Sequence, residues 1–214
     1  MTTAAPANFE RTAVGAFRDL PLVAHARDGA GPVKSISVSG TLHPSGSLTV
    51  EFQLAAELRA VRLVPSVCQP RRRDELWRHT CFELFARHGN ETRYCEFNFS
   101  PSGDWAAYEF DNYRGTPRDA TQRPIDVTVQ TSGLAQIRLR ARIDLRSAFA
   151  NETVPLDPAV WRLNCAAVIE CTDGSLSYWA VHHPRPQPDF HDAAGFCIVL
   201  SGSRAAVDSQ VAQQ

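Results

Sequence analysis

The chain of 214 residues lacks most features that mark a particular catalytic or cofactor class. Met1 is the only methionine, so a histidine–methionine haem site is excluded. No P-loop, HExxH, dinucleotide-binding or nucleophile-elbow motif occurs. Six cysteines are present without a CxxC pair, and most of them are expected to be small buried thiols. The sequence therefore predicts a protein that is not an enzyme, with no cofactor and no bound metal.

The chain also lacks a charge surplus and a long apolar run. Its 22 basic and 23 acidic residues give a formal net charge of -1, which predicts neither a nucleic-acid nor an anionic-membrane partner. No stretch approaches the roughly 18 apolar residues of a membrane-spanning helix. Residues 1–10 have neither an early positive cluster nor an apolar segment. We therefore expect no secretory signal and a cytoplasmic location.

Alternation of apolar and polar residues, interrupted by Gly, Pro, Asn and Asp, dominates the chain. It predicts a single-domain, all-β fold: an antiparallel immunoglobulin-like or jelly-roll-like β-sandwich of about nine strands. A short helical turn is expected at 144–150, an irregular segment at 1–20, the domain at 21–202 and a disordered tail at 203–214. The clearest strand patterns cover residues 35–39, 48–54, 81–86, 94–100, 105–110, 125–130, 135–143, 161–170, 176–181 and 195–200.

The hairpin within residues 76–114 carries the strongest functional signal. Alternation places Phe97 on one side of its second strand, and Glu96 and Asn98 on the other. In the first strand, Glu83 lies between two apolar neighbours. A carboxylate in such surroundings costs several kcal/mol unless it is hydrogen-bonded or reaches solvent. The pattern predicts one shared polar face, which is typical of a ligand-binding surface.

The run from Trp77 to Arg114, with Ser177-Tyr-Trp-Ala and Pro188-Asp-Phe-His, resembles bacterial DOMON-like domain proteins. That group is related to family 9 carbohydrate-binding modules and to haem-binding cytochrome domains. The resemblance covers most of the chain and implies an immunoglobulin-like β-sandwich. In the carbohydrate-binding branch, a sugar lies between two tryptophans and is hydrogen-bonded by acidic, amide and arginine side chains. Trp77, which precedes Glu83 by six residues, matches the first aromatic and its acidic partner.

These observations predict a non-catalytic module that binds a sugar or another small polar ligand. An aromatic ring covers the apolar face of a sugar, and carboxylates and amides bond its hydroxyl rim. Trp179 is the first choice for a second stacking ring and Trp105 the second choice. The predicted ligand-binding residues are Trp77, Glu83, Glu96, Asn98, Arg114, Asn164 and Trp179.

Other readings of the same residues stay open at this stage. Glu83 and Glu96 could pair with arginines across the sheet, or act as acid and base on a glycoside. A sheet face or edge could bind a protein partner, which would make the chain an interaction scaffold. A metal cluster of His79, Cys81 and His191 or a histidine-only haem site would be the less favoured outcome, because lone histidines and cysteines are more often structural.

Overall fold

The computed structural model describes residues 11–65, 69–120, 125–149 and 160–201. Within these ranges the chain forms thirteen strands, one short α-helix and three 3-10 helices. The strands are β1 (Arg11–Val14), β2 (Ala16–Ala24), β3 (Val33–Leu42), β4 (Ser47–Ala56), β5 (Cys81–His88), β6 (Tyr94–Phe99), β7 (Trp105–Phe110), β8 (Arg118–Asp119), β9 (Asp126–Ser132), β10 (Gln136–Asp144), β11 (Val160–Glu170), β12 (Leu176–Ala180) and β13 (Ile198–Ser201). The helices are η1 (Leu58–Ala60), η2 (Leu76–Arg78), α1 (Leu145–Ala148) and η3 (Ala193–Gly195).

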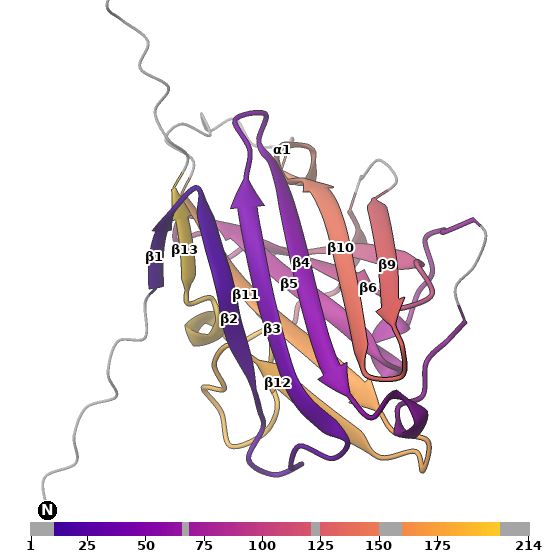
Figure 1. Cartoon of the computed structure of the whole chain (residues 1–214). Helices are drawn as coiled ribbons and strands as arrows, with labels where there is room; N and C mark the ends of the chain where they lie inside the picture. Colours follow the sequence, from indigo (N-terminus) through magenta and orange to yellow (C-terminus); the bar gives the residue numbers. More distant parts are fainter. Residues whose placement is uncertain (1–10, 66–68, 121–124, 150–159, 202–214) are drawn as a thin grey trace, which may run out of the picture.

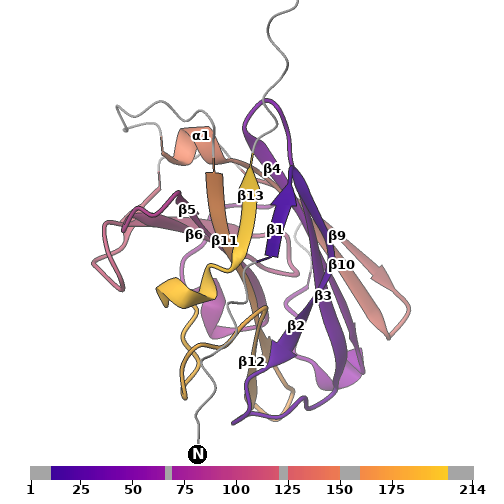
Figure 2. The ribbon, with the colours of Figure 1, turned by 90° about the vertical axis from the view of Figure 1, so that its left-hand side faces the viewer.

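The strands form one sheet that curls on itself into a half-barrel (Figure 1). Its order is β8-β7-β6-β5-β11-β12-β2-β3-β4-β10-β9, with β13 also beside β11 and β1 pairing with β13. Every pairing between these strands is antiparallel except that of β1 with β13. Figure 2 shows the layer of β2, β3, β4, β9 and β10 facing the layer that contains β5, β6 and β11.

The all-β, antiparallel prediction is confirmed, but a sandwich of about nine strands is not. Two short contacts join the layers into one sheet, because Trp179 and Ala180 of β12 pair with Ala24 and Val23 of β2. The alternation that predicted the strands follows their burial closely, as in β10, where every second residue is buried. The helical turn expected at 144–150 is α1, whose first amides bond the Asp144 side chain.

The N-terminal prediction is wrong in part. Residues 11–14 form β1, and β2 begins at Ala16, so the segment 1–20 is not irregular throughout. β1 pairs with β13, a partner far along the chain that local patterns do not indicate. The tail expected at 203–214 lies outside the described residues. Among the described helices, none is long and apolar enough to cross a membrane.

The main core lies between the two layers. Phe52 of β4 and Phe82 of β5 meet there with their ring centroids 5.2 Å apart, and both side chains are fully buried. The layer of β5, β6 and β11 is unusual because it is buried on its outer face as well. Phe190 and Phe196, from the segment between β12 and β13, pack there against Phe85 in a second apolar cluster. This covered outer face holds the candidate site.

Truncation of a ring at the centre of the main core should destabilise the whole domain. We expect Phe52→Ala to lower the free energy of unfolding by about 3–5 kcal/mol, since it removes buried surface and leaves a cavity. Denaturant unfolding measures the change. Leu134→Ala, at an exposed position in the β9–β10 turn, is the control and should change it by less than about 0.5 kcal/mol. A Phe52→Ala protein as stable as the control would contradict this account of the core.

Candidate functional site

A pocket of about 750 Å³ opens on the outer face of the layer formed by β5, β6, β7, β11 and β12. Both apolar rings and ionisable groups line it. The lining residues are Arg27, Asp74, Glu75, Trp77, Glu83, Glu96, Tyr108, Phe110, Arg114, Gly115, Pro117, Val168, Tyr178, Gln187, Pro188, Phe190 and His191. Its size suits a small organic ligand.

A row of small and polar side chains crosses the sheet beneath the pocket. Strand register places Ala106, Asn98, Glu83, Ala166 and Ala180 in this row, which crosses five strands. The three alanines are buried under other side chains: Ala106 packs with Leu76, and Ala166 and Ala180 belong to the apolar cluster that contains Phe190. Glu83 is the member of the row that lines the pocket.

Aromatic side chains from separate segments form the walls. Tyr108 and Phe110 rise from β7, Tyr178 from β12, and Phe190 from the segment after β12. The Tyr108 hydroxyl donates a hydrogen bond of 2.8 Å to Asp74, and this bond ties β7 to the segment that precedes η2. The pocket thus combines apolar ring surface with a polar floor.

Trp77 lies at the pocket in the short helix η2 and remains 46% exposed. Its neighbour Leu76 is buried and anchors the turn. Glu75 adopts a left-handed backbone (φ 61°) and forms an ion pair of 2.8 Å with Arg78. The Arg78 guanidinium lies 5.2 Å from the centre of the tryptophan ring and covers one of its faces. The other face is therefore the one that a ligand can cover.

Glu83 is the most isolated acid in the pocket. It is only 3% exposed and sits in the middle of β5. Among the residues that the structure describes, none forms a hydrogen bond or an ion pair with its carboxylate. The carboxyl group lines the pocket, so solvent or a ligand there can complete its hydrogen bonding.

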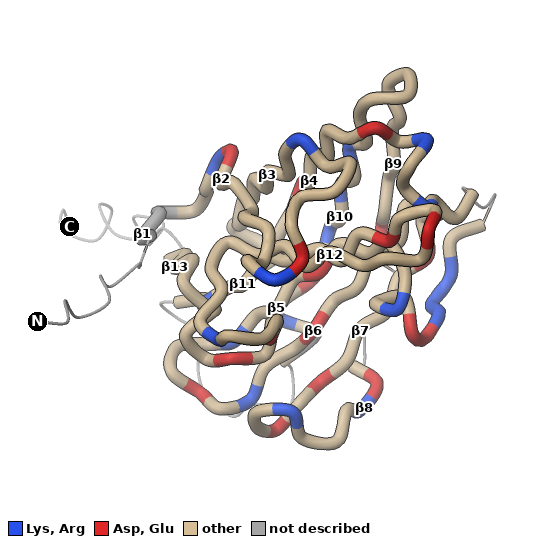
Figure 3. Tube along the Cα trace, turned by 90° about the horizontal axis from the view of Figure 1, so that it is seen from below, with Lys and Arg blue, Asp and Glu red and all other residues tan. Residues whose placement is uncertain are grey.

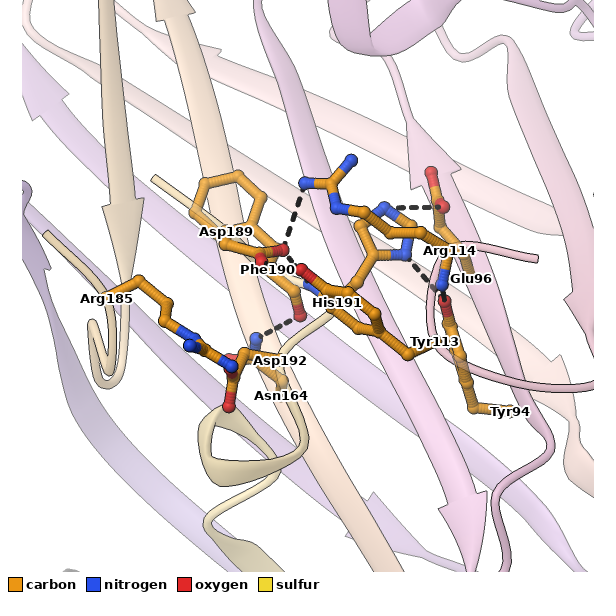
Figure 4. A network of polar contacts seen from close by, with 10 residues as sticks. All are labelled: Tyr94, Glu96, Tyr113, Arg114, Asn164, Arg185, Asp189, Phe190, His191 and Asp192. Atoms are coloured by element: carbon orange, nitrogen blue, oxygen red, sulfur yellow. Dashed lines mark hydrogen bonds and ion pairs between the residues drawn. The ribbon is translucent and has the colours of Figure 1, made fainter. Parts of the chain in front are cut away.

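Glu96 is held in place by its neighbours on the same face. The Asn98 amide donates to its Oε1 at 2.7 Å. On the other side, Nε2 of His191 lies 3.7 Å from its Oε2 (Figure 4). The Tyr94 hydroxyl in turn lies 2.8 Å from Nδ1 of His191. Register places Glu96 diagonally across from Glu83, so the two carboxylates are near neighbours.

A loop held by ion pairs closes this side of the pocket. Arg114 has a left-handed backbone (φ 50°), and its amide donates to the Tyr94 hydroxyl at 3.2 Å. Its guanidinium donates to Asp189 at 2.9 Å, and the Tyr113 hydroxyl bonds the same carboxylate at 2.5 Å (Figure 4). Non-glycine residues with positive φ are uncommon and concentrate at functional sites. Arg114 and Glu75 are two of the three found among the described residues.

Burial changes the protonation of these groups. The pKa of Glu83 lies well above its ordinary value of 4.5, because it is desolvated and close to Glu96. Desolvation also raises the pKa of Glu96 to about 7, although Asn98 and Arg114 oppose the shift. His191 is shifted the other way, to a pKa of about 4, and is neutral at pH 7. The pair therefore keeps its protons to a higher pH than two ordinary glutamates would.

Figure 3 shows acidic positions on β5, β6 and β7, with basic positions nearby. On the pocket rim, Asp74 is paired with Arg72 at 3.0 Å. The acids at the rim and in the closing loop thus have arginine partners, whereas Glu83 on the floor has none among the described residues.

The structure brings together four of the seven predicted site residues: Trp77, Glu83, Glu96 and Arg114 all line the pocket. Asn98 lies behind them and positions Glu96. The remaining two lie away from the pocket lining.

Asn164 and Trp179 require correction. Asn164 is buried and donates to the backbone carbonyl of Phe190 at 2.9 Å, so it supports the wall of the pocket. Trp179 was predicted as the second stacking ring, but its side chain lies in the main core and its Nε1 donates to Ser177 at 3.0 Å. Trp105, the second choice, lies in the same core. Strand alternation correctly placed Tyr178 and Trp179 on opposite faces of β12. The face that meets the pocket is that of Tyr178.

Other functional residues were missed by sequence reasoning. Tyr108 and Tyr178 share the outer face with the predicted acids, and strand parity alone could have indicated them. Phe190 and His191 come from an irregular segment that only long-range packing brings to β6.

The proposed metal cluster of His79, Cys81 and His191 is not assembled. His79 bonds Glu170 at 2.8 Å, whereas His191 bonds Tyr94. In the described part of the chain, no group of three or more His, Cys, Asp or Glu residues could hold a metal ion. The five cysteines in that part are all buried, and none of them forms a disulfide bond.

Comparison with family models and with curated proteins finds no match. Among solved structures, the fold is similar to a crystal structure from Bacteroides uniformis described as a putative carbohydrate-binding protein. The TM-score is 0.64 and the sequence identity 18%, over 86% of this chain and 85% of that one. At this identity the similarity defines the class of fold, a β-rich half-barrel.

The raised pKa values predict how Glu83 affects stability. The unfolded chain loses these protons near pH 4.5 while the folded pair keeps them, so stability falls as the pH rises from about 4.5 through the folded pKa values. Replacing Glu83 by the neutral isostere Gln should therefore have a smaller effect at pH 5 than at pH 8. At pH 8, Glu83→Gln should stabilise the protein by on the order of 1–3 kcal/mol.

Denaturant unfolding at both pH values tests this expectation. The lowered pKa of His191 makes the protein lose stability as the pH falls below about 6.5. This effect is the same in the wild type and in Glu83→Gln, so it cancels when their free energies of unfolding are subtracted. The exposed Glu57→Gln variant carries the same change of charge and should show no such dependence. A Glu83→Gln effect that is equal at pH 5 and pH 8 would contradict the raised pKa values.

Proposed function

We propose that this chain is a non-catalytic binding module whose pocket holds a carbohydrate. One observation carries the proposal: the half-exposed ring of Trp77 lines the same pocket as the buried carboxylates of Glu83 and Glu96. A pyranose has an apolar C–H face and a rim of hydroxyls. The ring suits the face, and the carboxylates suit the rim.

The remaining lining supports the same ligand class. Tyr178 and Phe190 supply further ring surface that could replace the second tryptophan of the predicted stacking pair. Arg114 and His191 offer nitrogen atoms at the edge of the floor. The structural neighbour from Bacteroides uniformis is described as a putative carbohydrate-binding protein, which agrees with this proposal at the level of the fold. Membership of the DOMON-like group and the cytoplasmic location stay predictions.

Trp77→Ala should abolish most of the sugar affinity while leaving the fold intact, because Trp77 is half exposed at the rim. Loss of one stacking ring is worth roughly 1–3 kcal/mol, or a weakening of about 5-fold to 150-fold. Thermal unfolding against a panel of mono- and oligosaccharides identifies a ligand, which must raise the stability of the folded state. Isothermal titration calorimetry, which does not depend on the Trp77 signal, then measures the affinity of the wild type, of Trp77→Ala and of Leu134→Ala, a control outside the pocket.

Two outcomes would contradict the proposal. Sugar binding that is unchanged in Trp77→Ala would place the site elsewhere. Stability that no sugar alters would favour the protein-interaction scaffold, and release of a product from an aryl glycoside would assign the two carboxylates to catalysis instead.

A further inference from the structure

Glu83 and Glu96 form a place in the pocket that the chain itself leaves incomplete. Glu96 accepts from Asn98 and lies near His191 and Arg114. Glu83 is 97% buried and has no hydrogen-bond donor or cation partner among the described residues. A ligand in the pocket can therefore supply a group that bonds this carboxyl group directly.

The charges around the floor decide which group fits best. The rim acids Asp74 and Glu75 are paired with Arg72 and Arg78, outside the pocket floor. The guanidinium of Arg114 is already bonded to Asp189 at 2.9 Å. The floor thus holds two adjacent carboxyl groups, whose negative charge grows as their protons leave with rising pH. A hydroxyl can bond there, but only a cation also offsets the charge.

The walls suit a cation as well. Tyr108, Phe110, Tyr178 and Phe190 line the pocket together with Trp77. The faces of aromatic rings attract an ammonium group, most strongly where water is excluded. The pocket thus combines carboxyl groups on its floor with aromatic rings on its walls, and both kinds of group attract an ammonium ion.

We propose that the pocket selects sugars that carry an amine, with the ammonium group bound between Glu83 and Glu96 and the sugar ring against Trp77. This inference rests on the proposed carbohydrate site and names the ligand class for it. It adds an ionic contact that a neutral sugar cannot make.

Binding should be linked to proton release. The raised pKa values leave the free pair more protonated at pH 5.5 than at pH 7, and an ammonium group displaces protons to solvent, so the affinity for an amino sugar should rise from pH 5.5 to pH 7. A neutral sugar should show a weaker dependence. The titratable and charged groups that face this floor are Arg27, Asp74, Glu75, Cys81, Tyr94, Tyr108, Arg114, Tyr178 and His191.

The test compares matched sugar pairs on the full chain: glucose with glucosamine, galactose with galactosamine, and mannose with mannosamine. Ligand-observed NMR at pH 7 and pH 5.5 gives each dissociation constant. We expect at least one amino sugar to bind tenfold or more tightly than its neutral partner at pH 7. Glu83→Gln should bring that ratio close to one while neutral-sugar binding persists, and Glu57→Gln should leave the ratio unchanged.

The outcomes separate this inference from the carbohydrate proposal. Equal affinity for both members of every pair would overturn the amine preference and leave carbohydrate binding in place. Absence of binding by any neutral or amino sugar would overturn both. Ethylamine that binds as tightly as the amino sugars would show a cation site without a role for the sugar ring. A ratio that survives in Glu83→Gln would remove Glu83 from the site.

Discussion

The central physical constraint in this molecule is the burial of two neighbouring carboxylates, Glu83 and Glu96, on the outer face of a β-sheet. Placing both charges away from water is costly, and the proteins that tolerate it either retain a proton or supply a partner. This chain supplies Asn98 to Glu96 but leaves Glu83 free within the described structure. The raised pKa values of both groups follow from that arrangement.

Much of the surrounding structure serves to create this environment. The main core between the two layers fixes β5 and β6, so the acids stand at defined positions. Three buried alanines in the same row as Glu83 pack under neighbouring apolar side chains on this face. The segment after β12 then covers the outer face, and the pair of Arg114 with Asp189 ties it to the loop after β7. A rigid sheet thus presents a shielded, acidic hollow with aromatic walls.

The sequence predicted the strands well because alternation reflects burial directly. The same alternation placed Glu96 and Asn98 on one face, and the hairpin motif indicated Trp77 and Glu83. Alternation could not decide which face of β12 meets the core, and for that reason Trp179 was predicted at the site instead of Tyr178. The position of His191 beside β6 and the pairing of β1 with β13 both depend on contacts between segments that are far apart in the sequence. No local pattern encodes such contacts.

Carbon-13 NMR of glutamate carboxyl groups, recorded from pH 4 to pH 9 in the free protein, tests the central claim most directly. Spectra of Glu83→Gln and Glu96→Gln assign the two signals. The account predicts that Glu83 titrates well above the ordinary pKa of 4.5 and that Glu96 titrates with a pKa of about 7. Two carboxyl groups that both ionise near the ordinary pKa of 4.5 would contradict the raised pKa values and the ligand chemistry inferred from them.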